Sequence, residues 1–404
     1  MIALRVLDLA DESGALCGRI LADLGADVVK IEPPSGDPGR RMPPFADDRP
    51  DPNRSLSWLA ANAGKRSITC NLGSTTGRDL FCRLAERADV VVATEPLPAG
   101  LDYAALSALN PRLIFVSITP YGAGSACPAS DLEVTASSGA LWLAGDPESE
   151  PVRTAYPMAP AWTGMYGAAG ALMALLARDS TGHGQYVDVS GQASMLTAIS
   201  HAPVFWDLLR EEQPRSGPFL VGRSVTGVRF RNIWPCRDGY ITFALYGGAA
   251  GRATGRALVA WMEERGGAPE ALKAIDWDQF DVATAPAELV AQVEDAIGPF
   301  FLTLTKDEFS REVGGRNMLG YPVGTVEDIA RDEQLEARGF WQTLGPPWDS
   351  TPIRFPGSFA FVDAERLPGP CSAPRLGEHN TEVYGSELGL SSEEVTALRS
   401  AGAL

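Results

Sequence analysis

The chain has 404 residues, 45% of them hydrophobic and 21% charged, a composition typical of a globular protein large enough for two domains. Its formal net charge of −17 excludes non-specific nucleic-acid binding, which needs a basic surface, but not a small anionic ligand held by a local cluster of arginines. No apolar run approaches the roughly 18 residues that cross a bilayer, and no leader pattern opens the chain, so we expect a cytoplasmic protein without a membrane partner.

The first 120 residues alternate between strand and helix patterns. Residues 4–10 (LRVLDLA) predict a strand, residues 13–25 a helix, and residues 26–32 (ADVVKIE) a strand buried on both faces. Further strands are predicted at 66–72, 89–93 and 112–118, with a helix at 76–88. This alternation predicts an α/β fold with a Rossmann-like open sheet of the doubly wound type.

The expected nucleotide motifs are absent from this sheet. The first strand is followed by DESGALCG, which lacks G-x-G-x-x-G, and no P-loop occurs in the chain. The cysteines form no CxxC pair, and with His183, His201 and His379 they give no zinc-ligand spacing. We therefore expect reduced, structural cysteines, no metal and no nucleotide cofactor.

The second half of the chain changes in composition. One long helix is predicted at 192–210, and an Asp-Gly turn predicts a hairpin within 228–245. We predict a large α/β domain (1–210), a linker (211–227), a small α+β domain (228–335) and a return segment (336–404). The return segment would complete the large domain and end in a helix capped at Ser391 or Ser392.

Six segments together resemble the family III CoA-transferases, which include formyl-CoA and carnitine CoA-transferases and α-methylacyl-CoA racemases. They occur in the same order along nearly the whole chain, at 20–40, 62–72, 109–122, 130–147, 182–190 and 376–404. The resemblance implies acyl-CoA as the substrate and a small domain inserted into the large one. It also implies a dimer of interlocked rings, with the active site between the large domain of one subunit and the small domain of the other.

The family's transferases attack the acyl-CoA with an aspartate, which passes through a mixed anhydride and an aspartyl-CoA thioester. Only a carboxylate can carry this covalent route. The aspartate stands four residues before a glycine at the start of a long helix, and here Pro160 occupies that place before Gly164. Proline fits the first turn of a helix but offers no nucleophile.

Other acids are weak substitutes for the missing aspartate. Asp131 matches a family acid position, although it also suits the start of a helix at Leu132. Ser130 stands where the racemases carry a histidine, so both racemase bases are absent. Glu133 is the remaining nearby carboxylate.

The CoA site implied by the resemblance is partly kept. Arg40, Lys65 and Arg66 match basic positions of the family, and guanidinium suits phosphate, although Lys65 and Arg66 also suit a structural role. The loop ATEPLPAG (93–100) lacks the asparagine, aromatic and basic residues that receive the adenine end in relatives.

Several further residues have alternative readings. Gly247, Gly248 and Gly251 suit either a mobile loop over a partner's site or tight backbone turns. His379 resembles a family-typical residue, for which a hydrogen-bonded, buried ring is expected. Four residues could either line an apolar pocket or belong to the core: Trp142, Met158, Trp162 and Tyr166.

Three functions are compatible with these observations. The first is the non-nucleophilic subunit of a heteromeric CoA-transferase, as in the benzylsuccinate CoA-transferases, with a related chain as partner. The second is a stand-alone homodimer that isomerises or eliminates acyl-CoA with Asp131 or Glu133 as base. The third is a non-catalytic CoA-binding or scaffold protein. The sequence specifies neither the acyl group nor the carboxylate acceptor.

Overall fold

The structure is a computed structural model that describes residues 4–94, 96–125, 127–221, 225–345, 352–363, 365–367, 369 and 371–404. The chain divides into two compact units. The first comprises Met1–Leu141, Thr154–Leu208 and Glu333–Leu404, and the second comprises Trp142–Arg153 and Leu209–Asp332. Within the described residues, no helix has the length and apolarity needed to cross a membrane.

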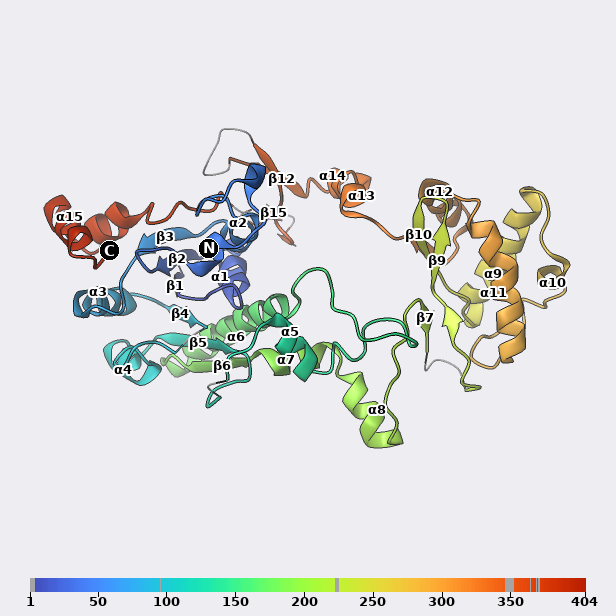
Figure 1. Cartoon of the computed structure of the whole chain (residues 1–404), viewed down its shortest axis with the longest axis horizontal. Helices are drawn as coiled ribbons and strands as arrows, with labels where there is room; N and C mark the ends of the chain where they lie inside the picture. Colours follow the sequence, from blue (N-terminus) through green and yellow to red (C-terminus); the bar gives the residue numbers. More distant parts are fainter. Residues whose placement is uncertain are drawn as a thin grey trace. The chain divides into compact units, whose positions relative to one another are not determined.

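The first unit is built on a six-stranded sheet in the order β3-β2-β1-β4-β5-β6 (Figure 1). Every neighbouring pair is parallel. The strands are β1 (Arg5–Asp8), β2 (Asp27–Glu32), β3 (Arg66–Thr69), β4 (Val90–Ala93), β5 (Ile114–Thr119) and β6 (Tyr186–Ser190). This order confirms the predicted doubly wound α/β sheet.

Helices cover both faces of the sheet. On one face, α1 (Ala15–Asp23) and α6 (Ala159–Thr181) enclose a core with the strands. On the other, α3 (Thr75–Ala85), α4 (Tyr103–Leu109), η3 (Thr381–Glu387) and α15 (Ser392–Ser400) enclose a second core. The other helical segments of this unit are η1 (Pro38–Arg41), η2 (Ala46–Asp48), α2 (Leu56–Asn62), α5 (Asp131–Ser137), α7 (Gly191–Ala198), α8 (His201–Leu209) and α14 (Glu333–Ala337).

The C-terminal tail packs against the sheet formed by the N-terminal half (Figure 1). The Tyr384 hydroxyl donates to the Thr69 carbonyl at 2.8 Å, and the Asn71 amide donates to the Ala403 carbonyl at 2.8 Å. Two short hairpins precede this tail, β12 (Trp341–Leu344) with β13 (Ile353–Pro356) and β14 (Phe361–Val362) with β15 (Glu365–Arg366). The last helix begins after Ser391 with a capping box to Glu394, as predicted.

The single helix predicted at 192–210 is wrong, because the chain forms α7 and α8 with a break between them. Ile199 ends α7 in a non-helical conformation with φ −116° and ψ 29°. Pro203 explains the break, since a proline in a continuous helix would clash with the carbonyl four residues earlier, at Ile199. In the first turn of α8 the same proline is tolerated.

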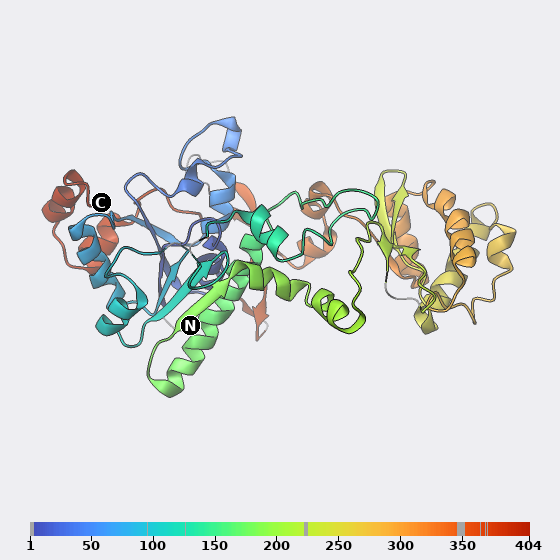
Figure 2. The same ribbon diagram turned by 60° about the horizontal axis from the view of Figure 1, so that its bottom comes forward.

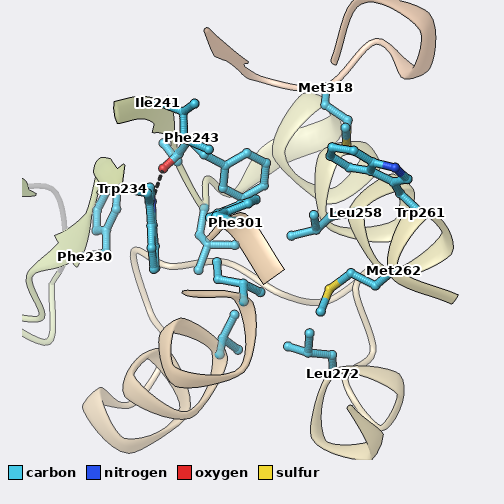
Figure 3. Close-up of a cluster of buried hydrophobic side chains, with 14 of the residues drawn as sticks. Phe230, Trp234, Ile241, Phe243, Leu258, Trp261, Met262, Leu272, Phe301 and Met318 are labelled. Atoms are coloured by element: carbon cyan, nitrogen blue, oxygen red, sulfur yellow. Dashed lines mark hydrogen bonds between the residues drawn. The ribbon is translucent and has the colours of Figure 1, made fainter. Parts of the chain in front are cut away.

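The second unit has an apolar core under a small antiparallel sheet, β11-β10-β9 (Figure 3). The predicted hairpin is present as β9 (Ile233–Cys236) and β10 (Gly239–Phe243), joined at Asp238. The Trp234 indole donates to the Phe243 carbonyl at 2.9 Å inside this core. The remaining elements are β7 (Phe219–Leu220), β8 (Phe230–Arg231), β11 (Gly320–Pro322), α9 (Gly248–Glu264), α10 (Glu270–Lys273), α11 (Ala287–Phe301), α12 (Lys306–Arg316) and α13 (Val326–Ala330).

Candidate active site

A pocket of about 460 Å³ lies at the carboxyl ends of β1, β2 and β4. The chain winds outward from β1 to β3 in one direction and from β4 to β6 in the other, so the pocket sits at the switch point of the sheet. Open α/β sheets bind ligands in this crevice. Its lining comprises Leu9, Asp11, Glu12, Ile31, Pro33, Asp37, Pro38, Gly39, Met42 and Thr94.

The loop from β1 to α1 forms one wall of the pocket and is held by its own side chains and by Thr94, which follows β4. The Asp11 amide donates to Thr94 Oγ1 at 2.9 Å. Asp11 Oδ1 accepts from the Ser13 amide at 2.9 Å and from the Ser13 hydroxyl at 2.6 Å. The carboxylate of Asp11 therefore lies at the entry to α1, where the backbone amides favour a negative charge.

Arg40, a predicted CoA contact, is fully buried. Its guanidinium forms a two-pronged ion pair with Glu32, with Nε–Oε2 at 2.5 Å and Nη2–Oε1 at 2.7 Å. The other donors reach the carbonyls of Pro52 and Pro374 and Oδ1 of Asn53. Since a guanidinium has five N–H groups, all are engaged within the protein. CoA contact by Arg40 stays a prediction and would require this pairing to break.

Lys65 is likewise enclosed, in an ion pair with Asp8 at 2.7 Å. Its ammonium also donates to the Ala15 carbonyl and to Asn62 Oδ1, both at 2.8 Å. Burial lowers the pKa of Lys65 from its ordinary range, with Asp8 acting in the opposite direction. The three donors of the ammonium are thus used to fix α1 and α2 against the sheet.

Arg66 lies at the edge of the sheet and ties the C-terminal tail to it. Its guanidinium pairs with Asp27 at 2.6 Å, with Glu387 at 2.7 Å and with Glu382 at 2.9 Å. Arg5 joins the same group through Asp27 and Glu387. The observed contacts of Arg66 are structural, and a CoA contact stays a prediction.

Pro160 lies in the first turn of α6, as its sequence position predicted. This turn touches the wall of the pocket, because Thr163 Oγ1 donates to the Ser13 carbonyl at 2.8 Å. Gly164 allows the close approach, since a Cβ there would lie 2.6 Å from Leu16 Cβ and 3.0 Å from the Cys17 amide nitrogen. The helix is therefore intact with proline in its first turn, and the loss of a nucleophile at this place stays a prediction.

Asp131 supports the start of α6 across 28 residues of sequence. Its Oδ1 accepts from the Ala159 amide at 2.9 Å, and Met158, at the N-cap, provides no side-chain cap. A carboxylate at this end of a long helix is favourable. The contact gives Asp131 a capping function beside Pro160, while a catalytic one stays a prediction.

Glu133 is engaged in a different cap, at the start of α5. Its carboxylate accepts from the Ser130 amide at 2.6 Å in a capping box. Hydrogen bonds from the Ser130 backbone and side chain hold the pKa of Glu133 below its usual range. A carboxylate with a lowered pKa is a weaker base.

Of the four aromatic and methionine candidates, three lie at α6 in the first unit and one lies in the second unit. Trp162 and Tyr166 stack on one side of α6 with ring centroids 6.4 Å apart. Met158 and Trp162 pack against the small buried cluster formed by Val134, Ala159 and Met195. Trp142 belongs to the second unit, where the Arg215 guanidinium lies 4.9 Å from its ring centroid.

The glycines of the second unit have packing explanations. A Cβ on Gly251 would lie 2.0 Å from the Tyr246 carbonyl oxygen, and Gly248 has a φ of 73°. The ring of His379 accepts a hydrogen bond from the Ser67 amide at 3.2 Å, as expected, but it is half-buried instead of buried. A mobile loop at Gly247, Gly248 and Gly251 stays a prediction.

The acidic lining of the pocket was missed by the sequence analysis. Asp11 and Glu12 occupy the first turn after β1, the position where an α/β sheet meets its ligand. The absence of a glycine motif at this position says nothing about its charge. The adjacent acids after the first strand were the available signal.

The fold and the switch-point pocket define an α/β protein of the doubly wound class, and sequence comparison gives the family. The pattern of the CoA-transferase family III matches residues 3–380, so the chain belongs to this family. Succinyl-CoA:(R)-benzylsuccinate CoA-transferase subunit BbsE of Thauera aromatica is 34% identical over 99% of this chain and 97% of its own length.

Two further relatives extend the likeness. Formyl-CoA:oxalate CoA-transferase of Streptomyces coelicolor is 30% identical over 99% of this chain and 98% of its own length. The crystal structure of a CAIB/BAIF family protein from Brucella suis superposes with a TM-score of 0.77 at 28% identity, covering 95% of this chain and 98% of that one. The similarity therefore spans both units.

Proposed function

We propose that this chain is the non-nucleophilic subunit of a heteromeric acyl-CoA:carboxylate CoA-transferase. A related chain in the same complex would carry the catalytic aspartate. The observation that carries the proposal is Pro160 in the first turn of an intact α6, because a proline cannot form the acyl anhydride while the helix around it is preserved. The complex would act in the cytoplasm.

The relationship to BbsE supports a role as a subunit. That protein is named as a subunit, and the similarity covers almost the full length of both chains. Its name describes a transfer of CoA between succinyl-CoA and (R)-benzylsuccinate. The same class of exchange, thioester to carboxylate, is what we propose for the complex containing this chain.

The exposed side of α6 supports a protein partner. Figure 2 shows α6, the long green helix, at the surface of the first unit. Apolar side chains run along this side, and a row of this kind on one helix marks an interaction site. They are Met165, Tyr166, Leu172, Met173 and Leu176, of which Met173 and Leu176 are more than 70% exposed. We propose that a related subunit covers them in an interlocked pair.

The test is to tag the chain in its native host, purify it gently, and identify the co-purifying proteins by mass spectrometry. The expected partner is a stoichiometric relative with an aspartate aligned to Pro160. Succinyl-CoA with benzylsuccinate is a suitable probe pair. The complex should transfer CoA, and hydroxylamine added during turnover should label the partner's aspartate and no residue of this chain.

The purified chain without its partner is the control for this experiment. It should show no transfer, and transfer by this chain alone would refute the proposal. Recovery of the chain only as a homodimer would favour the stand-alone alternative or the scaffold alternative. An Asp131→Asn variant would then separate these, since only an acyl-CoA enzyme using Asp131 as base would lose turnover.

A further inference from the structure

The entry to α1 is the place where a doubly wound fold usually receives the phosphates of its ligand. The amides at the start of the first helix and the helix dipole favour an anion there. In this chain a built-in anion already occupies the loop, since Asp11 Oδ1 accepts from the amide and the hydroxyl of Ser13. A phosphate in the same place would meet a carboxylate instead of free donors.

The charges around the pocket leave a negative excess. Three carboxylates line it, from Asp11, Glu12 and Asp37, and none of its lining residues is basic. Asp37 is neutralised by Lys30, whose buried ammonium lies 2.8 Å away and also donates to the Ala10 carbonyl. Among the described residues Asp11 and Glu12 form no ion pair, so two negative charges face the ligand space.

Two basic residues that match family positions, Arg40 and Lys65, do not offset this excess. Arg40 forms a buried ion pair with Glu32, and Lys65 forms a buried ion pair with Asp8. Arg41, beside the lining residue Met42, is exposed and donates to the Ser35 carbonyl at 3.1 Å. Partial desolvation and the charges of Asp11 and Asp37 together raise the pKa of Glu12, whose side chain is exposed at the pocket.

We infer that Asp11 and Glu12 close the switch-point pocket of this chain to CoA and to other polyphosphate ligands. The inference rests on the proposed function and extends it. The half of the complex built around this chain's own pocket would be inactive in CoA transfer for two independent reasons. One is the missing nucleophile at Pro160, and the other is the negative charge of the pocket, which repels phosphate. CoA would bind only in the half built around the related subunit's aspartate.

The experiment measures CoA binding by the purified protein, as the number of CoA molecules bound per copy of this chain and their dissociation constant. The test variant is Asp11→Asn/Glu12→Gln, in which asparagine still caps the loop. The matched control is Asp79→Asn/Glu86→Gln, which makes the same change in net charge at exposed positions of α3 and its C-cap, on the opposite face of the sheet.

The test variant should gain one CoA site per copy of this chain, or tighten its affinity on the order of tenfold at low salt, because two like charges are removed from the pocket. The gain should shrink at about 1 M salt, where the Debye length is about 3 Å. The control should change affinity less than about twofold. If Asp11→Asn disturbs the loop, Glu12→Gln alone should give a smaller gain of the same sign.

Two results would overturn the inference. One is wild-type protein that already binds CoA at this chain as tightly as the test variant, and the other is an equal gain in the control. Neither outcome bears on the partner's aspartate or on transfer by the complex. Conversely, transfer by this chain alone would refute the proposed function whatever the pocket variants show.

Discussion

The two units of the chain stabilise their interiors by different means. Among the described residues, every buried polar or charged side chain except Thr254 lies in the first unit. The pairs Arg40–Glu32, Lys65–Asp8 and Lys30–Asp37 lie around its switch point. The interior of the second unit is apolar and rich in aromatic rings (Figure 3).

This difference distinguishes the unit that contains the candidate site from the unit whose interior is apolar. Loops from β1, β2 and β4 converge at the pocket, and their exposed backbone groups and turns require polar partners. A buried ion pair adds little net stability but is costly to break, whereas an apolar core loses stability in proportion to the atoms removed. Substitutions in the two units should therefore lower the free energy of unfolding for different reasons, an unpaired buried charge in the first unit and a cavity in the second.

The largest effect is expected from Arg40→Met. It leaves the Glu32 carboxylate buried without its partner, so we expect a loss of about 3–5 kcal/mol in the free energy of unfolding. Denaturant unfolding followed by circular dichroism measures it. Glu32→Gln in the same protein should recover part of the loss by removing the orphaned charge. Arg41→Met, at an exposed neighbour, is the control and should stay within about 0.5 kcal/mol.

A cavity in the second unit should cost somewhat less. Leu258 is fully buried among aromatic side chains, and Leu258→Ala should destabilise this unit by about 3 kcal/mol. Unfolding in low and high salt should give the same loss, because no charge changes. Leu302→Ala removes an exposed side chain and should have little effect. A salt-dependent loss for Leu258→Ala would contradict the contrast between the units.

The cap at the start of α6 should contribute less again. Asp131→Ala removes the acceptor of the Ala159 amide and should cost about 1 kcal/mol, while Asp131→Asn should retain most of the stability. Thermal unfolding of the two variants checks this order. Equal loss in both variants would show that the charge, and not the hydrogen bond, supports the helix.

The smallest effect concerns acid stability at the edge of the sheet. Burial raises the pKa of Asp27, but hydrogen bonds and charge from Arg66 and Arg5 outweigh it and hold the pKa below its ordinary value. A lowered folded pKa contributes stability above the ordinary aspartate range, and this is lost as the pH falls through the folded value. The partly exposed pair should be worth under about 1 kcal/mol.

Unfolding of wild type and Asp27→Asn across this pH range tests the sign. The wild type should be the more stable of the two near neutral pH, and the difference should vanish in acid. A difference that grows as the pH falls would mean that Asp27 is not held ionised by its arginine partners.

The alternation of strands and helices, and with it the doubly wound sheet, can be predicted from the sequence, because periodicity in apolar residues is a local property of the chain. The resemblance to the family also predicts that Pro160 stands where the transferases carry their nucleophile, and this stays a prediction. The buried ion pairs of Arg40 and Lys65 and the capping of α6 by Asp131 are visible only in the folded chain. The physical reason is that these contacts depend on loops distant in sequence, which meet only where parallel strands end at one edge of the sheet.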